Sequence, residues 1–161
     1  MSRKRSAYRP RAFLSSPLAL LRPASAQQAD GVMCRFYAAL DAMARGRRPG
    51  ELEWRDLSDA INTVETLATH LGKLPTEQVM PLVHAAIAAM ARAAERFKAG
   101  QGMRLDEPGL HALQDVLDVY AECLRVLTER EMSQAVDETQ RRVHALLRGV
   151  AAQPDHVVIA L

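Results

Sequence analysis

Aromatic residues are scarce in this 161-residue chain: one Trp, three Tyr and three Phe make up 4% of it. Sheets are enriched in aromatic and β-branched residues, whereas Ala and Leu, which dominate here, favour helices. The composition therefore excludes a β-sandwich and a collagen-like chain. With 48% hydrophobic and 25% charged residues, the chain has the balance of a globular protein, and its length predicts one domain.

Cysteines are equally few, because the chain has only Cys34 and Cys123. Two cysteines so far apart make neither a disulfide framework nor a zinc site. Each lies in an apolar stripe at helical spacing, so we expect two buried free thiols and a reducing compartment.

Long hydrophobic runs are also missing, since none reaches the roughly 18 apolar residues of a membrane span. The N-terminus resembles a secretory signal, with Arg3-Lys4-Arg5 ahead of the apolar stretch 12–21. However, Ser15-Ser16-Pro17 interrupt that stretch, and Arg22 lies where cleavage would occur. We therefore expect no membrane association and a cytoplasmic location.

The charge is distributed unevenly although the net charge is only +2. Residues 1–48 hold ten Lys and Arg against two acidic residues, and the remainder holds 11 basic and 17 acidic residues. A basic arm on an acidic body either meets an anionic partner or lies back across its own acidic helices. Such asymmetry also permits a homo-oligomer.

Five segments show helical periodicity. They span about 30–44, 53–71, 76–98, 106–127 and 128–149. Residues 1–28 have three prolines and no helical period, and 150–161 contain Pro154 and the apolar Val157-Val158-Ile159. The sequence thus predicts an all-α, single-domain bundle of about five helices (29–149), with an extended basic arm (1–28) and a short apolar tail (150–161).

Local signals set the expected helix ends. Thr76 is a good N-cap for the third segment, and Thr128-Glu129-Arg130-Glu131 forms a capping box that opens the fifth. A single continuous helix over 106–148 is the alternative. Pro81 lies too far inside the third segment for its first turn, so we expect a kink or a separate short opening turn. We expect Phe97 to face inward and His84 to be partly buried.

Residues 67–79 resemble a helix-turn-helix core, with Ala68 and Gly72 at the right spacing. Pro81 would break the recognition helix, and that helix has no Arg or Lys before Arg92. We therefore expect a capped turn between two core helices.

A polar stripe on the fourth segment consists of His111, Asp115, Asp118 and Glu122. Carboxylates and imidazole on one face can ligate a metal, but a di-metal bundle needs Glu-x-x-His on paired helices. We expect a solvated face or a landing surface for the basic arm, and no metal or other cofactor. A metal-dependent bundle enzyme using this stripe is the alternative.

Catalytic motifs are missing from the chain: it has no glycine-rich phosphate loop, no G-x-S-x-G and no HExxH. We therefore expect a binding protein and not an enzyme.

The N-terminal arm is the most specific feature. Arginine and lysine side chains bind phosphates, and a tyrosine between them can stack on a base. The residues expected to bind nucleic acid or another partner are Arg3, Lys4, Arg5, Tyr8, Arg9 and Arg11. The alternatives are a protein-docking segment, an intramolecular strap, or a solubilising tail without a partner.

Two segments resemble those of small proteins of proteobacterial phages and prophages. Residues 4–10 resemble the Lys/Arg-Lys-x-Tyr-Arg-Pro arm of that family, with one extra residue. Residues 54–68 resemble its pattern Asp-x-x-x-Leu-x-x-Ala-x-Asn-x-x-Glu-x-Leu-Ala. The resemblance implies a mobile-element origin and a host cytoplasmic setting, without an activity. We thus expect a phage or prophage accessory protein that binds nucleic acid through its arm, or a protein-binding module such as an inhibitor of a host defence or regulatory complex.

Overall fold

The computed structural model describes residues 19–45 and 49–149. These residues form one short 3-10 helix, η1 (Ala19–Leu21), and five α-helices. The α-helices are α1 (Ala26–Arg45), α2 (Glu51–Thr69), α3 (Thr76–Lys98), α4 (Glu107–Val126) and α5 (Glu129–Leu147). No strand occurs among the described residues, so the predicted all-α bundle is confirmed there. A helix long and apolar enough to cross a membrane is also missing from this part of the chain.

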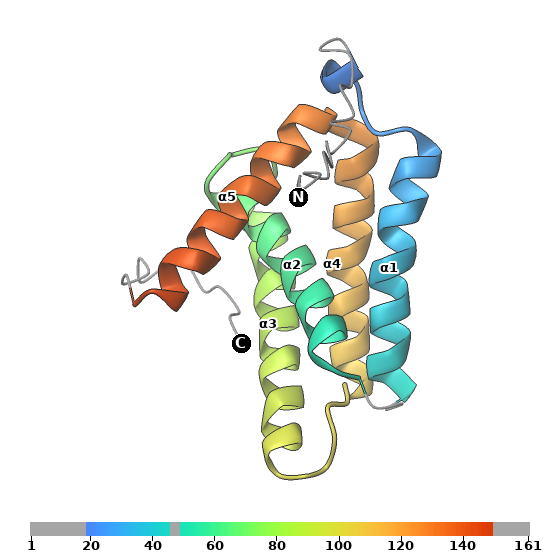
Figure 1. The fold of residues 1–161 in the computed structure, drawn as a ribbon, viewed down its shortest axis with the longest axis vertical. Helices are drawn as coiled ribbons and strands as arrows, with labels where there is room; N and C mark the ends of the chain where they lie inside the picture. The colour runs from blue at the N-terminus through green and yellow to red at the C-terminus, as the bar shows by residue number, and fades with distance from the viewer. Residues whose placement is uncertain (1–18, 46–48, 150–161) are drawn as a thin grey trace, which may run out of the picture.

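Helices α1 to α4 form a four-helix bundle, and α5 crosses it from outside (Figure 1). Within the bundle, α1 packs on α2 and α4, and α3 packs on the same two helices. Helix α5 packs chiefly on α2 and touches α4 little. Consequently, α2 has bundle helices on one side and α5 on the other.

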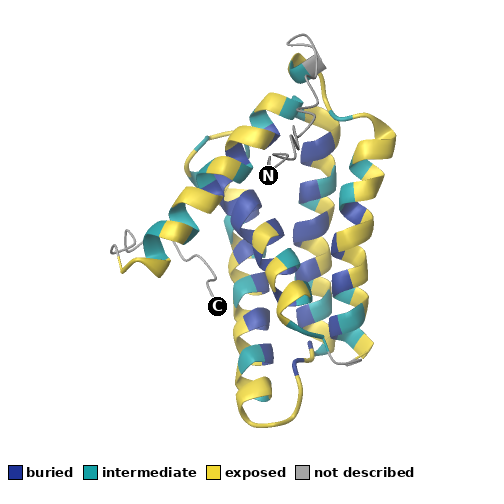
Figure 2. Ribbon diagram, in the orientation of Figure 1, coloured by how far each residue is buried: buried dark blue, intermediate teal, exposed yellow. Residues whose placement is uncertain are grey.

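The apolar stripes predicted for the bundle helices form its core (Figure 2). The largest fully buried apolar side chains come from α1 to α4: Phe36, Met43, Leu57, Ile61, Val64, Leu67, Val83, Met90, Leu113, Val116 and Leu117. The rings of Phe36 and Tyr120 meet edge to face with centroids 5.0 Å apart. Burial raises the pKa of Tyr120 to about 12.

Three burial predictions were wrong. Phe97 is 56% exposed because it lies in the last turn of α3, beyond the reach of its neighbours. Cys34 and His84 are exposed because each lies one residue beyond a buried position, at Met33 and Val83. Cys123 is buried as expected, and burial raises its pKa to about 11.

Capping side chains separate α4 from α5, so the alternative of one continuous helix was wrong. Leu127 and Thr128 are extended, and Thr128 Oγ1 accepts a hydrogen bond from the Glu131 backbone N–H at 3.2 Å. The Glu131 carboxylate accepts from the Thr128 backbone N–H at 3.0 Å and from Lys73 Nζ at 2.6 Å. Together with the Thr128 hydroxyl, these donors lower the pKa of Glu131 to about 2. The capping box is therefore confirmed.

The start of α3 differs from its prediction. Pro75 is the N-cap, and Thr76 is the first helical residue, whose hydroxyl donates to the Ala68 carbonyl at 3.0 Å. Helix α3 runs through Pro81 without a separate opening turn. Pro81 is exposed, so only the Glu77 carbonyl loses its helical donor, and water can replace it.

The helical body begins earlier than the predicted residue 29. Helix η1 and the first turn of α1 lie inside the segment predicted as an extended arm. Pro23 forms an isolated antiparallel bridge with Thr128, and the Glu129 backbone N–H donates to the Arg22 carbonyl at 2.8 Å. These contacts attach residues 22–23 to the corner between α4 and α5. Residues 1–18 of the predicted arm and the predicted tail 150–161 lie outside the described residues.

A polar face of α2 is buried under α5. Residues 60–68 are all buried, and they include Asn62, Thr63, Glu65 and Thr66. The Thr66 hydroxyl donates to the Asn62 carbonyl at 2.8 Å and accepts from Thr139 Oγ1 at 2.9 Å. Buried polar groups need such partners, because a buried hydroxyl without one costs free energy.

Arg142 of α5 supplies the charge-assisted part of this contact. Its Nη1 donates to Thr66 Oγ1 at 2.8 Å, and its Nη2 lies 3.1 Å from Glu65 Oε1. The side chains of Arg142 and Glu65 are 12% and 0% exposed. Helix α5 is thus attached to α2 by a buried ion pair and by hydrogen bonds of the Thr66 and Thr139 hydroxyls.

Replacing Arg142 with methionine should destabilise the fold by about 3 kcal/mol, because Glu65 would remain buried without its guanidinium partner. The control is Arg141→Met on the same helix, whose side chain is 73% exposed and pairs only with Glu138. That change should alter stability by about 0.5 kcal/mol or less. Urea unfolding followed by circular dichroism measures both, and equal losses would contradict the structural role of the buried pair.

Candidate groove between α2 and α5

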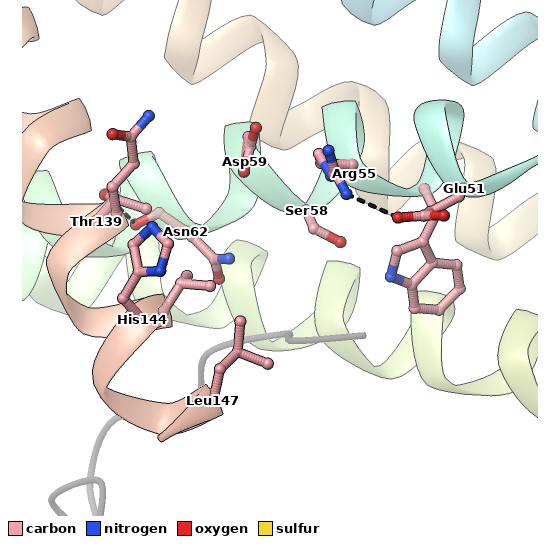
Figure 3. A pocket seen from close by; sticks show the side chains of 11 residues that line it. Glu51, Arg55, Ser58, Asp59, Asn62, Thr139, His144 and Leu147 are labelled. Atoms are coloured by element: carbon pink, nitrogen blue, oxygen red, sulfur yellow. Dashed lines mark hydrogen bonds and ion pairs between the residues drawn. The ribbon is translucent and has the colours of Figure 1, made fainter. Parts of the chain in front are cut away.

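The two helices meet where Thr139 contacts Thr66, and α5 then diverges from the first half of α2. The space between them is a groove of about 440 Å³ (Figure 3). Helix α2 lines it with Glu51, Trp54, Arg55, Ser58, Asp59 and Asn62, and α5 lines it with Thr139, Gln140, Val143, His144 and Leu147. A volume of 300 to 1,000 Å³ is usual for ligand pockets.

Helical spacing explains why these side chains share the groove. Trp54, Ser58 and Asn62 follow one another at four-residue steps, so they form one stripe along α2. Thr139, Val143 and Leu147 do the same along α5. Each helix therefore gives the groove a wall about two turns long.

Two polar atoms on the α2 wall have no hydrogen-bond partner. Trp54 is 3% exposed and Ser58 is 5% exposed, yet neither Trp54 Nε1 nor Ser58 Oγ makes a hydrogen bond. Figure 3 shows Ser58 on the α2 helix and Leu147 on the α5 side of the groove. An indole N–H can only donate, whereas a hydroxyl can donate and accept. Helix α2 thus has two buried hydrogen-bonding groups without a partner beside the groove, about one helical turn apart.

The rest of the groove lining mixes apolar, polar and charged side chains. Val143 is half-buried, and Leu147 is 59% exposed. Arg55 Nη2 and Glu51 Oε1 form an ion pair at 2.7 Å, drawn as a dashed line in Figure 3. Asp59 reaches solvent, but the protein atoms around its carboxylate partly desolvate it and raise its pKa.

Ser58 has no activating base as a hydrogen-bond partner in the described part of the chain. A nucleophilic serine needs a base within hydrogen-bonding reach, and Ser58 Oγ has no hydrogen-bond partner. His144 and Asp59 therefore do not activate it. The groove matches a ligand that has apolar groups for Trp54, Val143 and Leu147 and an acceptor for the indole N–H.

The structure does not describe the binding residues that were predicted from the sequence. Arg3, Lys4, Arg5, Tyr8, Arg9 and Arg11 all fall outside the described residues.

The polar stripe of α4 is exposed, as expected for a solvated face. Asp118 accepts a hydrogen bond from the Tyr37 hydroxyl at 3.2 Å, and Glu122 pairs with Arg125 at 3.4 Å. Burial, with Asp118 adding to it, raises the pKa of Tyr37. Within residues 19–45 and 49–149, no group of three or more His, Cys, Asp and Glu side chains is placed to hold a metal ion.

The segment that resembles a helix-turn-helix core is a turn between two bundle helices. Gly72 has a φ of +58°, a conformation that glycine adopts without strain. Val79 and Val83 of the following helix are buried in the core. These observations agree with the capped turn expected from the sequence.

The groove was not predicted from the sequence, although α2 contains a weak signal for a covered polar face. Between residues 58 and 69 its polar side chains are mostly uncharged, with Asp59 and Glu65 the only charges. A solvent-facing helix usually carries more charge. That pattern suggests a covering element, but it does not identify α5 as that element.

Comparisons of the chain with protein-family models, with curated proteins and with solved structures find no match.

Replacing Ser58 with alanine should stabilise the free protein by about 1 to 2 kcal/mol, because a buried hydroxyl without a partner is removed. Alanine also has the higher helix propensity, worth about 0.5 kcal/mol. Ser133→Ala at an exposed position of α5 measures that propensity term alone. Thermal and urea unfolding give both values, and a gain at Ser58 no larger than at Ser133 would show that the hydroxyl is already satisfied.

Proposed function

We propose that this protein is a non-enzymatic binding protein that captures an extended segment of a partner protein in the groove between α2 and α5. The observation that carries the proposal is the pair of unpartnered buried groups, Trp54 Nε1 and Ser58 Oγ, on one wall. A bound segment would satisfy both and cover the exposed Leu147.

The spacing of the two groups favours a peptide backbone as the ligand. Side chains four residues apart on a helix lie about 5–6 Å from one another. In an extended chain, groups that point to the same side recur every two residues, at about 6.6 Å. A peptide carbonyl can accept from Trp54 Nε1 while the next backbone group on that side meets Ser58 Oγ. Alternate side chains of the segment would contact Val143 and Leu147.

The resemblance of the N-terminal arm to phage and prophage proteins supports a bacterial host protein as the partner. In this proposal the protein acts in the host cytoplasm as an accessory factor, for instance by occupying a segment that a host complex needs. A binding groove without an activated nucleophile is consistent with such a stoichiometric role.

A library of random 12-residue peptides without tryptophan, displayed and selected on the full-length protein, tests this function. Selected peptides should share two or more apolar residues and should change the fluorescence of Trp54, the only tryptophan in the chain. Leu147→Glu should weaken their binding by about tenfold or more, because burying a leucine side chain contributes about 1.5–3 kcal/mol.

Leu52→Glu is the matched control, because Leu52 is 70% exposed and lies outside the groove. Its peptide affinities should equal those of the wild-type protein. If selection yields no peptide that distinguishes the Leu147 variant from the Leu52 variant, the groove is not a peptide-binding site.

Nucleic-acid binding by the arm is a second candidate function. Residues 1–18 contain five Lys and Arg, Tyr8 and no acidic residue, which is a composition suited to phosphates and stacked bases. In this proposal Arg3, Lys4, Arg5, Arg9 and Arg11 contact phosphates, and Tyr8 stacks.

Fluorescence anisotropy with random duplex and single-stranded oligonucleotides tests the second candidate. Five phosphate contacts predict a slope of about −4.5 for log affinity against log salt concentration on duplex DNA. Replacing the five basic residues by glutamine should abolish binding and leave the melting temperature unchanged. Tight binding by that neutral variant would exclude the arm as the contact.

A further inference from the structure

The groove opens next to a segment of the same chain. Leu147 is the last residue of α5 and lines the groove. Gly149 has a φ of +74°, and its N–H donates to the Leu146 carbonyl at 2.9 Å. A left-handed residue at this position ends a helix and turns the chain away from the helix axis. Residues 150–161 therefore start within a few residues of the groove.

We propose that residues 150–161 occupy the groove between α2 and α5 and compete there with the partner segment. This inference rests on the proposed peptide-binding function and adds its regulation. The segment is an intramolecular inhibitor, which a partner must displace before it can bind.

The length of the segment is sufficient. Its 12 residues span up to about 40 Å when extended, at about 3.3 Å per residue. The α5 wall from Thr139 to Leu147 is about 12 Å long, at 1.5 Å per residue. Four extended residues cover that wall, and the others can form the connection.

The composition of the segment matches the groove. Val157-Val158-Ile159 is a run of β-branched residues, which favour the extended conformation, and Pro154 disfavours a continuing helix. The side chains of this run can cover Trp54, Val143 and Leu147. Its backbone carbonyls provide the acceptor that Trp54 Nε1 lacks. Val157-Val158-Ile159 contains no charged side chain, so burying the side chains of this run buries no charged group.

Tethering makes even weak binding effective. A segment joined by a short flexible connection has an effective concentration of about 1 mM, so an intrinsic dissociation constant of about 100 µM leaves the groove covered about ten-elevenths of the time. An external segment then binds about tenfold more weakly than it would to the open groove.

The test uses the full-length chain with Val157, Val158 and Ile159 all replaced by serine. The exchange rate of the Trp54 indole proton, followed as a single nitrogen-15 NMR signal, should rise about tenfold as the covered fraction disappears. Ala151→Ser with Ala152→Ser is the matched control and should leave that rate unchanged. A synthetic peptide of residues 150–161, added to the triple variant, should restore the protection.

Equal exchange rates in the wild-type protein and the triple variant would overturn the proposal. Protection that increases with protein concentration would also overturn it, because the occupant would then come from a second copy. The substituted residues follow the last of the five described helices, so the variants should fold like the wild-type protein. Melting followed by circular dichroism checks this expectation.

The same variants separate this inference from the proposed function. If selected peptides bind the triple variant and the wild-type protein equally well, the inhibitor fails and the binding function stands. If no peptide binds either protein but the exchange rate of the indole proton changes on the triple substitution, the proposed peptide-binding function is contradicted. The proposal that residues 150–161 occupy the groove is then supported.

Discussion

The contact between Arg142 and the polar face of α2 determines how the fifth helix lies. The bundle of α1 to α4 has its own apolar core, whereas α5 buries only Met132, Ala135 and Thr139. A helix with so few buried side chains needs another attachment, and the guanidinium provides it by meeting both Glu65 and Thr66. Burying two charges costs desolvation free energy that only close, well-oriented partners offset. Because of this requirement, one placement of α5 against α2 is much more stable than the placements next to it.

The position of α5 creates the groove. Beyond Arg142, in the last turns of α5, Val143 is half-buried and Leu147 is 59% exposed, so this end of the helix is incompletely covered. On the opposite wall, the ring of Trp54 is buried, and its N–H lacks a hydrogen-bond acceptor. A protein surface that keeps an unsatisfied donor beside exposed apolar side chains gains from any segment that covers both. The proposed partner binding and the proposed self-inhibition both depend on these two walls.

The accuracy of the sequence-based predictions depended on the range of the interaction involved. The capping box at Thr128 involves atoms three residues apart, and its prediction was right. The fourth helix begins at Glu107, close to the predicted residue 106. Phe97, Cys34 and His84 were wrongly expected to be at least partly buried, because burial depends on whether another helix lies opposite. At the end of α3 none does, and Cys34 and His84 each lie one residue beyond a buried position. The binding residues predicted in the arm are not tested by the described residues.

The sequence by itself determined the helical class and the approximate extent of the helices, and it favoured a break between α4 and α5 over one continuous helix. These properties arise from periodicity, propensity and hydrogen bonds to near neighbours along the chain. Only the tertiary structure decided that α5 covers the polar face of α2, because that contact joins residues 73 to 77 positions apart. The low charge around Asn62 and Glu65 indicates a covering element, but local sequence does not specify which element covers them. The groove exists because two helices diverge in space, and no local pattern encodes that divergence.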